Sequence, residues 1–455
     1  MPERPPSSAL GATTWRLTDS PDLLASERVV TLRRSLLLAN IAGFLGGYFV
    51  LHNQWLQLTW SLVLGAIWLA VGGHADLATA LRRDRWMQAM MGLGALMLVR
   101  SSIFESPGAT LTTLWLGWGN SFLLLGFLLM LWQVGRQPKV ITALGKPLVA
   151  MAAVAAGVSL VGFYSFHPEG YFGARLQNCF VYGGLNPVCT GLTFGFAACW
   201  AAAVWSASTN PRERWLWLLA GVTLYAATLM TLCRGALLAL VCAHVVLLLT
   251  VRWKRSRKPV LLMVGCLMAF QLTAPILAAL AAKEASERFG TPQTNAGDIY
   301  GHNVVAANQV HSMVTRADSG RMEIYLAALG SMTTWQDWLI GKGLWADDDF
   351  WSCSLHWYPE HIHGVFWDTF VHAGLPSLLA LVGLVFWGLR RAYWLAQQGE
   401  PIWITLSCYG LAGLLFDGDT IWALVSVTRY ETLLFWTPLV IASARFTQFS
   451  RRNVA

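Results

Sequence analysis

Long apolar segments alternate with short polar ones along almost the whole chain. A membrane-spanning helix needs about 20 consecutive apolar residues, and about twelve segments meet or approach that length. They cover residues 35–52, 55–73, 86–103, 112–134, 143–163, 190–208, 214–233, 236–251, 259–281, 365–388, 401–416 and 421–444. The pattern predicts an all-α polytopic integral membrane protein with about 12 transmembrane helices. Segments 236–251 and 421–444 are the weakest predictions, because the first is short and the second contains charges.

One long polar stretch interrupts this alternation between the ninth and tenth apolar segments. It divides the chain into an N-terminal tail (1–34), helices 1–9 (35–281), a large loop domain (282–364), helices 10–12 (365–445) and a C-terminal tail (446–455). Residues 1–26 contain prolines and acids rather than the short apolar core of a cleavable signal peptide. We therefore expect a disordered tail there, followed by an uncleaved signal anchor.

Composition supports the membrane class. Hydrophobic residues make up 55% of the chain and charged residues 12%, whereas about a quarter of residues are charged in a soluble protein. The 24 tryptophans suit anchoring at the membrane interface. A net charge of +8 could suggest nucleic acid, but the positions of the basic residues explain it better, so we expect no nucleic-acid partner.

The basic residues orient the predicted helices. With the N-terminus in the cytoplasm, most of the 32 Lys and Arg residues fall in inside segments, as the positive-inside rule requires. The outside loops around His52, Ser106 and Gly418 contain none. This topology places both termini in the cytoplasm and the loop domain on the outer side. The outer basic residues are then exceptions that need a reason: Arg100, Arg175, Arg234, Lys283, Arg288, Arg316, Arg321, Lys342 and Arg429.

Two of these arginines are the main candidates for binding an anion. Arg234 ends the segment 214–233, where a charge at the membrane boundary indicates function or a snorkelling anchor. Arg321 lies at a predicted helix start, with Asp318 or Ser319 as the cap and Glu323 in the first turn. A helix N-terminus attracts phosphate and an arginine adds a bidentate donor. The alternative for Arg321 is a solvated side chain on a surface helix.

Two histidines close the loop domain. His361 and His363 could share a metal with nearby Asp347–Asp349, His356 or Glu360. The simpler interpretation is that one neutral imidazole accepts a proton from an attacking hydroxyl group, without a metal. A structural role for a loop histidine is the third possibility.

Other residues are secondary candidates. Arg175 could reach the same outer site or anchor its loop, and Arg429 could pair with Glu431 or contact a lipid substrate. A disulfide between Cys179 and Cys189 is possible on the outer side. The sequence contains no CxxC, no Gly-Lys-Ser/Thr phosphate loop and no GxSxG elbow, which argues against an ATP-driven pump.

Taken together, the chain resembles the superfamily of bacterial O-antigen ligases and O-antigen polymerases, most clearly over residues 214–390. Three blocks carry the resemblance: Arg234–Gly235–Ala236; Ser319–Gly320–Arg321 followed by Ile340–Gly341–Lys342–Gly343–Leu344; and His363 followed by Gly374–Leu375–Pro376. Residues 365–373 supply the family's nine-residue spacing. The chain departs from the family pattern at Gly364, where an amide or hydroxyl residue is usual, and at Ser377, where a second glycine is common.

The resemblance implies an inverting, metal-independent glycosyltransferase of GT-C-like architecture in the bacterial inner membrane, with a periplasmic active site and no cofactor. The donor would be a glycan on undecaprenyl diphosphate. A ligase transfers it to the lipid A–core oligosaccharide in lipopolysaccharide biosynthesis, and a polymerase to another lipid-linked repeat unit. The resemblance maps His363 to the general base and Arg234 and Arg321 to the diphosphate, with Arg175, His361 and Arg429 as further substrate contacts.

We favour the ligase over an O-antigen or exopolysaccharide polymerase. Protein O-oligosaccharyltransferases are a third relative but are usually longer at the C-terminus. A transporter for a lipid-linked sugar is the alternative outside enzymology. It should show internal repeats and charges at the membrane midplane, whereas here the key charges gather at one face.

Overall fold

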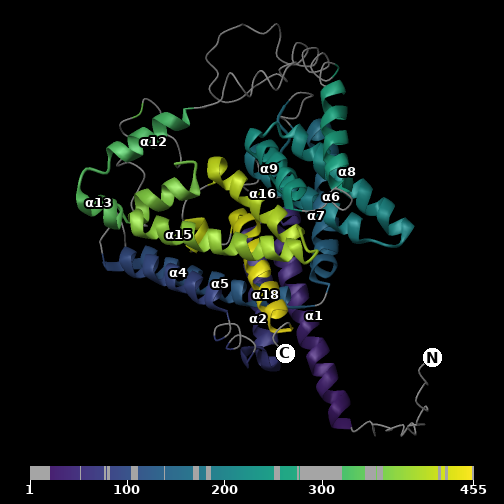
Figure 1. Ribbon diagram of the computed structural model, residues 1–455, viewed down its shortest axis with the longest axis horizontal. Helices are drawn as coiled ribbons and strands as arrows, with labels where there is room; N and C mark the ends of the chain where they lie inside the picture. Colours follow the sequence, from purple (N-terminus) through teal and green to yellow (C-terminus); the bar gives the residue numbers. More distant parts are fainter. Residues whose placement is uncertain are drawn as a thin grey trace, which may run out of the picture.

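The computed structural model describes residues 21–51, 53–75, 84–103, 111–137, 139–167, 174–180, 186–250, 257–273, 320–343, 362–418, 422–425 and 429–452, with a few isolated positions between them. Every regular element in these ranges is a helix (Figure 1). The N-terminal half contains α1 (Pro21–Val50), α2 (Gln54–Trp68), η1 (Leu69–Gly73), α4 (Arg85–Ile103), α5 (Leu111–Gly135), α6 (Val140–Phe166), α7 (Pro187–Ala207), α8 (Pro211–Met230) and α9 (Arg234–Thr250).

A further helix covers residues 257–273. The remaining elements are α12 (Arg321–Gly330), α13 (Trp335–Ile340), α15 (Val365–Gln397), α16 (Ile402–Asp417), α17 (Trp422–Val425), η2 (Thr432–Trp436) and α18 (Thr437–Arg452). Elements η1 and η2 are π-helical turns that continue α2 and lead into α18. The helical class predicted from the hydropathy pattern is thus confirmed.

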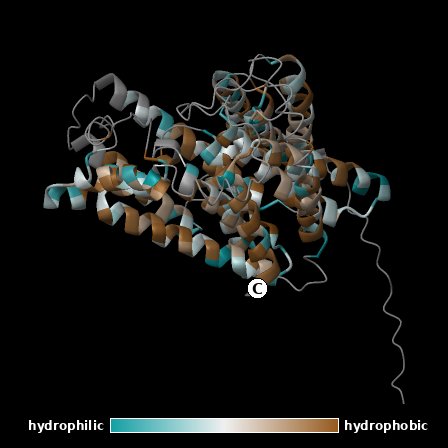
Figure 2. Ribbon diagram, turned by 90° about the horizontal axis from the view of Figure 1, so that it is seen from above, coloured by the Kyte–Doolittle hydropathy of each residue, from teal (hydrophilic) through white to brown (hydrophobic). Residues whose placement is uncertain are grey.

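The described residues include 6 helices long and apolar enough to cross a membrane. They are Arg28–Val50, Trp55–Gly73, Gly117–Gly135, α6, α7 and α15, and the apolar helices Arg234–Thr250 and Ile402–Leu415 are shorter. Apolar residues cover most of the long helices in Figure 2. The chain is therefore a helical membrane protein.

Several helices differ in extent from the predicted apolar segments. Helix α1 begins at Pro21, so part of the predicted tail 1–34 is helical; proline suits a first helical turn, which needs no N–H donor. Helix α15 runs nine residues beyond the predicted end at 388, to Gln397. The predicted span 421–444 is not one helix, because α17 ends at Val425 and Arg429 is not helical. The charges in that segment disfavour a continuous apolar helix.

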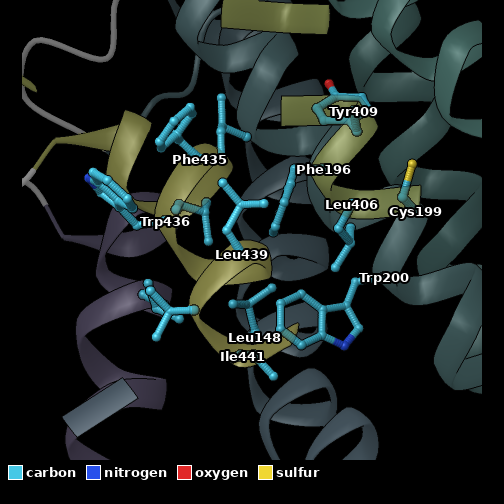
Figure 3. Close-up of a cluster of buried hydrophobic side chains, with 14 of the residues drawn as sticks. Leu148, Phe196, Cys199, Trp200, Leu406, Tyr409, Phe435, Trp436, Leu439 and Ile441 are labelled. Carbon is cyan, nitrogen blue, oxygen red and sulfur yellow. The ribbon is translucent and has the colours of Figure 1, made fainter. Parts of the chain in front are cut away.

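Helix α7 forms the centre of the molecule. Of the candidate spans it is the most enclosed, with 78% of its apolar window buried, and it packs against α6, α8, α9 and α16. Asn186 caps it with a hydrogen bond to the Val188 N–H, and Pro187 starts its first turn. In Figure 3 its Phe196 and Trp200 face side chains from α16 and α18. This core holds the helices that carry the site.

A second, smaller core joins α12 to the first part of α15. It consists of Ile324, Ala328, Met332, Ile362, Phe370 and Val371. The segment after α13 docks beside it, where Gly374 interrupts α15 with a φ of 77°. The N–H of Lys342 donates to the Val371 carbonyl at 2.8 Å, and that of Gly343 donates to the His372 carbonyl at 3.0 Å.

This docking requires glycine on both sides. A Cβ on Gly341 would lie 2.4 Å from the His372 carbonyl carbon, and one on Gly374 would lie 2.4 Å from the Leu339 oxygen. Both glycines also have positive φ angles, which side chains disfavour. Two of the sequence blocks, 340–344 and 374–376, are therefore in direct contact.

Candidate functional site

Four helix ends meet at the candidate site. Asp417 is the last residue of α16, and Arg234 and Arg321 are the first residues of α9 and α12. Helix α15 begins at Val365, directly after His363 and Gly364. Its start packs on the end of α16, since a Cβ on Gly364 would lie 3.1 Å from the Leu415 carbonyl oxygen. The site therefore combines three helix N-termini with one helix C-terminus.

Arg321 forms an ion pair with Asp417. The side chain of Asp417 is almost completely buried, and that of Arg321 is about one quarter exposed. Gly320 occupies the N-cap position of α12 with a φ of 76°. The predicted caps, Asp318 and Ser319, lie outside the described residues. Glu323 lies in the first turn as predicted.

Arg234 begins α9 rather than ending the preceding span. Helix α8 ends at Met230, and the chain turns over residues 231–233 with Leu232 in the left-handed region. The next residue, Gly235, lies against Asp417: a Cβ at this position would come within 1.7 Å of the Asp417 Oδ2. Only glycine permits this approach. The thiol of Cys233 contributes a long contact to the same oxygen, 3.9 Å from the sulfur.

Arg175 joins the site from the loop between α6 and α7. Its Nε donates to the Thr231 carbonyl at 3.0 Å, and the neighbouring Leu176 N–H donates to the Met230 carbonyl at 3.0 Å. The guanidinium therefore holds the turn before Arg234 while remaining within electrostatic reach of Asp417. Both roles proposed for Arg175 from the sequence are compatible with this position.

The electrostatics of the site centre on one carboxyl group. Asp417 lies just beyond the apolar stretch Ile402–Leu415. Burial raises the pKa of its carboxyl above the usual value, and the charges of Arg321, Arg175 and Arg234 act in the opposite direction. Three guanidinium groups against one carboxylate, with three helix N-termini, give a cluster suited to an anion.

His363 lies at the entrance to α15 in a strained conformation. Its φ is 57°, in the left-handed region that few residues other than glycine adopt. Its carbonyl accepts a hydrogen bond from the Tyr325 hydroxyl of α12 at 3.1 Å. Tyr325 in turn stacks on Trp367 with ring centroids 5.1 Å apart. Helix α12 thus fixes both Arg321 and the backbone of His363.

The residue after His363 has a structural reason to be glycine. A Cβ on Gly364 would lie 3.1 Å from the Leu415 carbonyl and 3.4 Å from the Tyr325 hydroxyl. The larger residue usual in the resembled family would need those neighbours to move. Ser377, the other departure, is fully buried in α15.

The residue that follows Arg429 contacts the site. The Tyr430 hydroxyl donates to the Asp417 carbonyl at 3.1 Å. Arg429 and the buried Glu431 are both within electrostatic reach of the Tyr48 hydroxyl. Another outer basic residue, Lys342, has a different partner, since its Nζ lies 2.9 Å from the Asp337 Oδ2.

Some predicted residues lie outside the described part of the chain. They include His361 and the residues considered for a metal site, Asp347–Asp349, His356 and Glu360. Cys179 and Cys189 are both described, and no disulfide joins them, so the disulfide considered from the sequence is not formed.

The sequence reasoning missed Asp417 and Tyr325. Asp417 had a signal, because it is an ionisable residue at the end of the apolar segment 401–416. Tyr325 had none beyond its place one turn after Arg321.

Comparison with known proteins does not assign the chain to a family. No protein-family model matches the chain, and no curated protein matches it.

Proposed function

We propose that this protein is an O-antigen ligase: an inverting, metal-independent glycosyltransferase that moves a glycan from undecaprenyl diphosphate to a sugar hydroxyl of lipid A–core. The observation that carries the proposal is the cluster of Arg175, Arg234 and Arg321 around Asp417, at the point where α15 begins after His363. The proposal includes a GT-C-like arrangement of about twelve spans, a site on the periplasmic face of the inner membrane and cytoplasmic termini.

The arginines suit the leaving group. Negative charge on a lipid diphosphate rises as the glycosidic bond breaks, and preorganised cationic groups stabilise that charge in the transition state. Arg234 and Arg321 are each the first residue of a helix, so the positive end of a helix dipole and a guanidinium lie together at each position. Such a site can hold a diphosphate without a metal ion.

His363 would act as the general base. A neutral imidazole takes the proton of the acceptor hydroxyl as the oxygen attacks the anomeric carbon, and the diphosphate leaves from the opposite face. The left-handed backbone of His363, together with the hydrogen bond from the Tyr325 hydroxyl to its carbonyl oxygen, defines the position of this residue. Backbone strain of this kind is frequent at functional sites.

Contacts near the ends of helices support the proposed topology. On the side proposed as cytoplasmic, Lys146 pairs with Glu213 at 2.7 Å and Arg391 with Asp84 at 2.6 Å. On the side proposed as periplasmic, the Asn178 amide donates to the Phe49 carbonyl at 3.0 Å. Each of these contacts joins two segments that the basic residues assign to the same side.

The alternative is an O-antigen or exopolysaccharide polymerase, which uses the same donor and a lipid-linked repeat unit as acceptor. The described contacts concern the donor site, so the acceptor distinguishes the two enzymes. A transporter is the less favoured class, because the arginines gather at the end of their helices rather than at mid-span.

The test is glycan transfer by the purified protein with EDTA present. The donor is an undecaprenyl-diphosphate-linked glycan and the acceptor is rough lipopolysaccharide. We expect a glycan ladder on lipopolysaccharide that disappears in His363→Ala and in Arg321→Ala but persists in Arg212→Ala, a control at an exposed arginine of α8.

Other outcomes are informative. Longer chains on the undecaprenyl carrier, without a ladder on lipopolysaccharide, would indicate the polymerase. Full activity of His363→Ala, or inhibition by EDTA that a divalent ion reverses, would refute the mechanism.

A further inference from the structure

Two short helices of the loop domain expose apolar side chains. On α12, Leu326 is 61% exposed and Met322, one turn earlier, is exposed as well. On α13, Trp335 is 69% exposed, and Trp338 and Leu339 are also exposed. Burying apolar surface gains about 25 cal/mol per Å², so this surface would be costly in contact with water.

Helix α12 is apolar on two faces. Ile324 and Ala328 fill the small core against α15, while Met322 and Leu326 lie on the exposed face. Between them the helix has few polar side chains, chiefly Arg321 and Glu323 at its start. A helix that is apolar nearly all round belongs in an apolar environment rather than at a water-exposed surface.

Helix α13 packs on α15, which carries an exposed apolar stripe of its own. The contact is at the Gly374 kink, and Figure 1 shows α13 at the left edge of the molecule beside one end of α15. Beyond the kink, α15 exposes Leu375, Leu379, Val382 and Phe386. Their spacing puts them on one helical face. Because α15 is long and apolar enough to cross a membrane, this stripe faces lipid.

Charge and composition also fit a membrane interface. Asp337 of α13 is paired with Lys342, so the helix presents a neutralised polar side together with two tryptophans. Tryptophan is favoured where an apolar ring meets lipid and an N–H meets polar groups. The Trp338 Nε1 donates to the Met332 carbonyl at 3.0 Å, which leaves its ring as the exposed part.

We propose that α12 and α13 lie in the interface of the phospholipid bilayer, with Met322, Leu326, Trp335 and Leu339 inserted among the lipids. Short amphipathic helices bind in this way at the boundary between headgroups and acyl chains. The consequence is that Arg321, the first residue of α12, is held at the depth of the lipid headgroups. The lipid contact is independent of the proposed glycan transfer.

The test uses the full chain in vesicles of phosphatidylcholine and phosphatidylglycerol that contain a phosphatidylcholine with a diazirine on its acyl chain. After irradiation, mass spectrometry maps the lipid adducts. We expect adducts on Met322, Leu326, Trp335 and Leu339 at yields similar to those on Leu379 and Phe386 of the α15 stripe. Adducts on α15 with none on α12 or α13 would overturn the proposal.

Paired variants sharpen the test. Leu326→Glu with Trp335→Glu should lower the adduct yield on both helices at least several-fold, because carboxylates resist insertion among lipids. Gln336→Glu adds a charge to another exposed position of α13 and is the matched control, with yields expected to change little. The exchanged side chains are exposed, so the fold should persist. Cross-links between two copies through this face, in place of lipid adducts, would also contradict the proposal.

Discussion

At the scale of single residues, Asp417 organises the candidate site. Three guanidinium groups close together repel one another unless an anion lies between them, and Asp417 is the anion that the chain itself supplies. Its Oδ1 contacts Arg321, and its Oδ2 faces Gly235 and the Cys233 thiol. A diphosphate arriving at Arg321 would therefore find the guanidinium already oriented, which reduces the cost of ordering it on binding.

Replacing this carboxylate tests whether it positions Arg321. In Asp417→Asn, the amide oxygen can still accept a hydrogen bond from Arg321, but the attraction between opposite charges is removed. This should remove most of the about 1.5–3 kcal/mol that such a charge-assisted bond is worth, so kcat/KM for transfer should fall about 10-fold. The double variant Asp417→Asn/Arg321→Gln should be no worse than Arg321→Gln alone, because both changes remove the same interaction. Losses that multiply in the double variant would show that Asp417 acts separately from Arg321.

The residues of this cluster differ in how visible they are in the sequence. Arg234 and Arg321 stand out in the sequence because the predicted topology places them on the outer side, where the positive-inside rule disfavours basic residues. A carboxylate does not violate that rule. Asp417 stands out in the sequence only as an ionisable residue at the end of an apolar segment, and its link to Arg321 depends on a contact across 96 positions of the chain. The left-handed backbone of His363 likewise depends on tertiary packing against Tyr325 and the end of α16.

At the scale of elements, the interlocked glycines determine how the α13 segment sits on α15. Gly341→Ala should destabilise this docking by about 1–3 kcal/mol, since it adds a Cβ 2.4 Å from the His372 carbonyl carbon at a positive φ. Gly383→Ala is the matched control in α15, because its Cβ meets no heavy atom within 4 Å. Backbone hydrogen exchange of residues 335–343 should rise in the first variant and stay unchanged in the second. Equal exchange in both variants would argue against the interlock.

Acid should loosen α13. Partial burial raises the pKa of Asp337, but its hydrogen bonds to Lys342 and Thr334 and the Lys342 charge outweigh this, so the pKa is lowered. A lowered pKa in the folded state stabilises the ionised form. This stabilisation is complete above the unfolded pKa of about 4 and is lost as the pH falls through the folded value.

Hydrogen exchange of α13 measured at decreasing pH, corrected for the intrinsic rate, should therefore accelerate below about pH 4. Asp337→Asn, which removes the charge and weakens the capping box with Thr334, should show fast exchange already at neutral pH. The same acid response in Asp337→Asn as in the wild type would assign the effect to another group.

The elements themselves were mostly predictable, because continuous apolar segments of nearly membrane-spanning length recur along the chain. The turns and kinks that interrupt the helices were harder to predict. The turn at 231–233 makes Arg234 the start of α9, whereas the apolar segments place it at the end of the preceding span. The sequence Gly374–Leu375–Pro376 indicates a kink in hindsight, but the segment that fills it comes from residues 341–343, which local patterns cannot reveal.

At the scale of the whole molecule, a second buried charge cluster lies on the side proposed as cytoplasmic and joins α4, α5, α15 and α18. The Arg391 guanidinium contacts Asp84 at 2.6 Å and also Ser443, and the Trp132 Nε1 donates to Asp84 at 2.8 Å. The Asp84 side chain is 0% exposed and that of Arg391 9%. The basic residues predicted which segments share this side, but not that one acid links four helices.

Breaking this pair should destabilise the whole bundle. Asp84→Ala leaves a buried guanidinium without its carboxylate, which typically costs about 3–5 kcal/mol. Glu213→Ala is the matched control, because its pair with Lys146 has side chains 42% and 37% exposed and such surface pairs contribute about 0–1 kcal/mol. Thermal unfolding in detergent, followed by tryptophan emission, should show a clear decrease in Tm for the first variant only.

The double variant Asp84→Leu/Arg391→Met should recover much of that stability, because no unpaired charge remains. A double variant as unstable as Asp84→Ala would mean that the cluster contributes through its hydrogen bonds to Trp132 and Ser443 rather than through its ion pair.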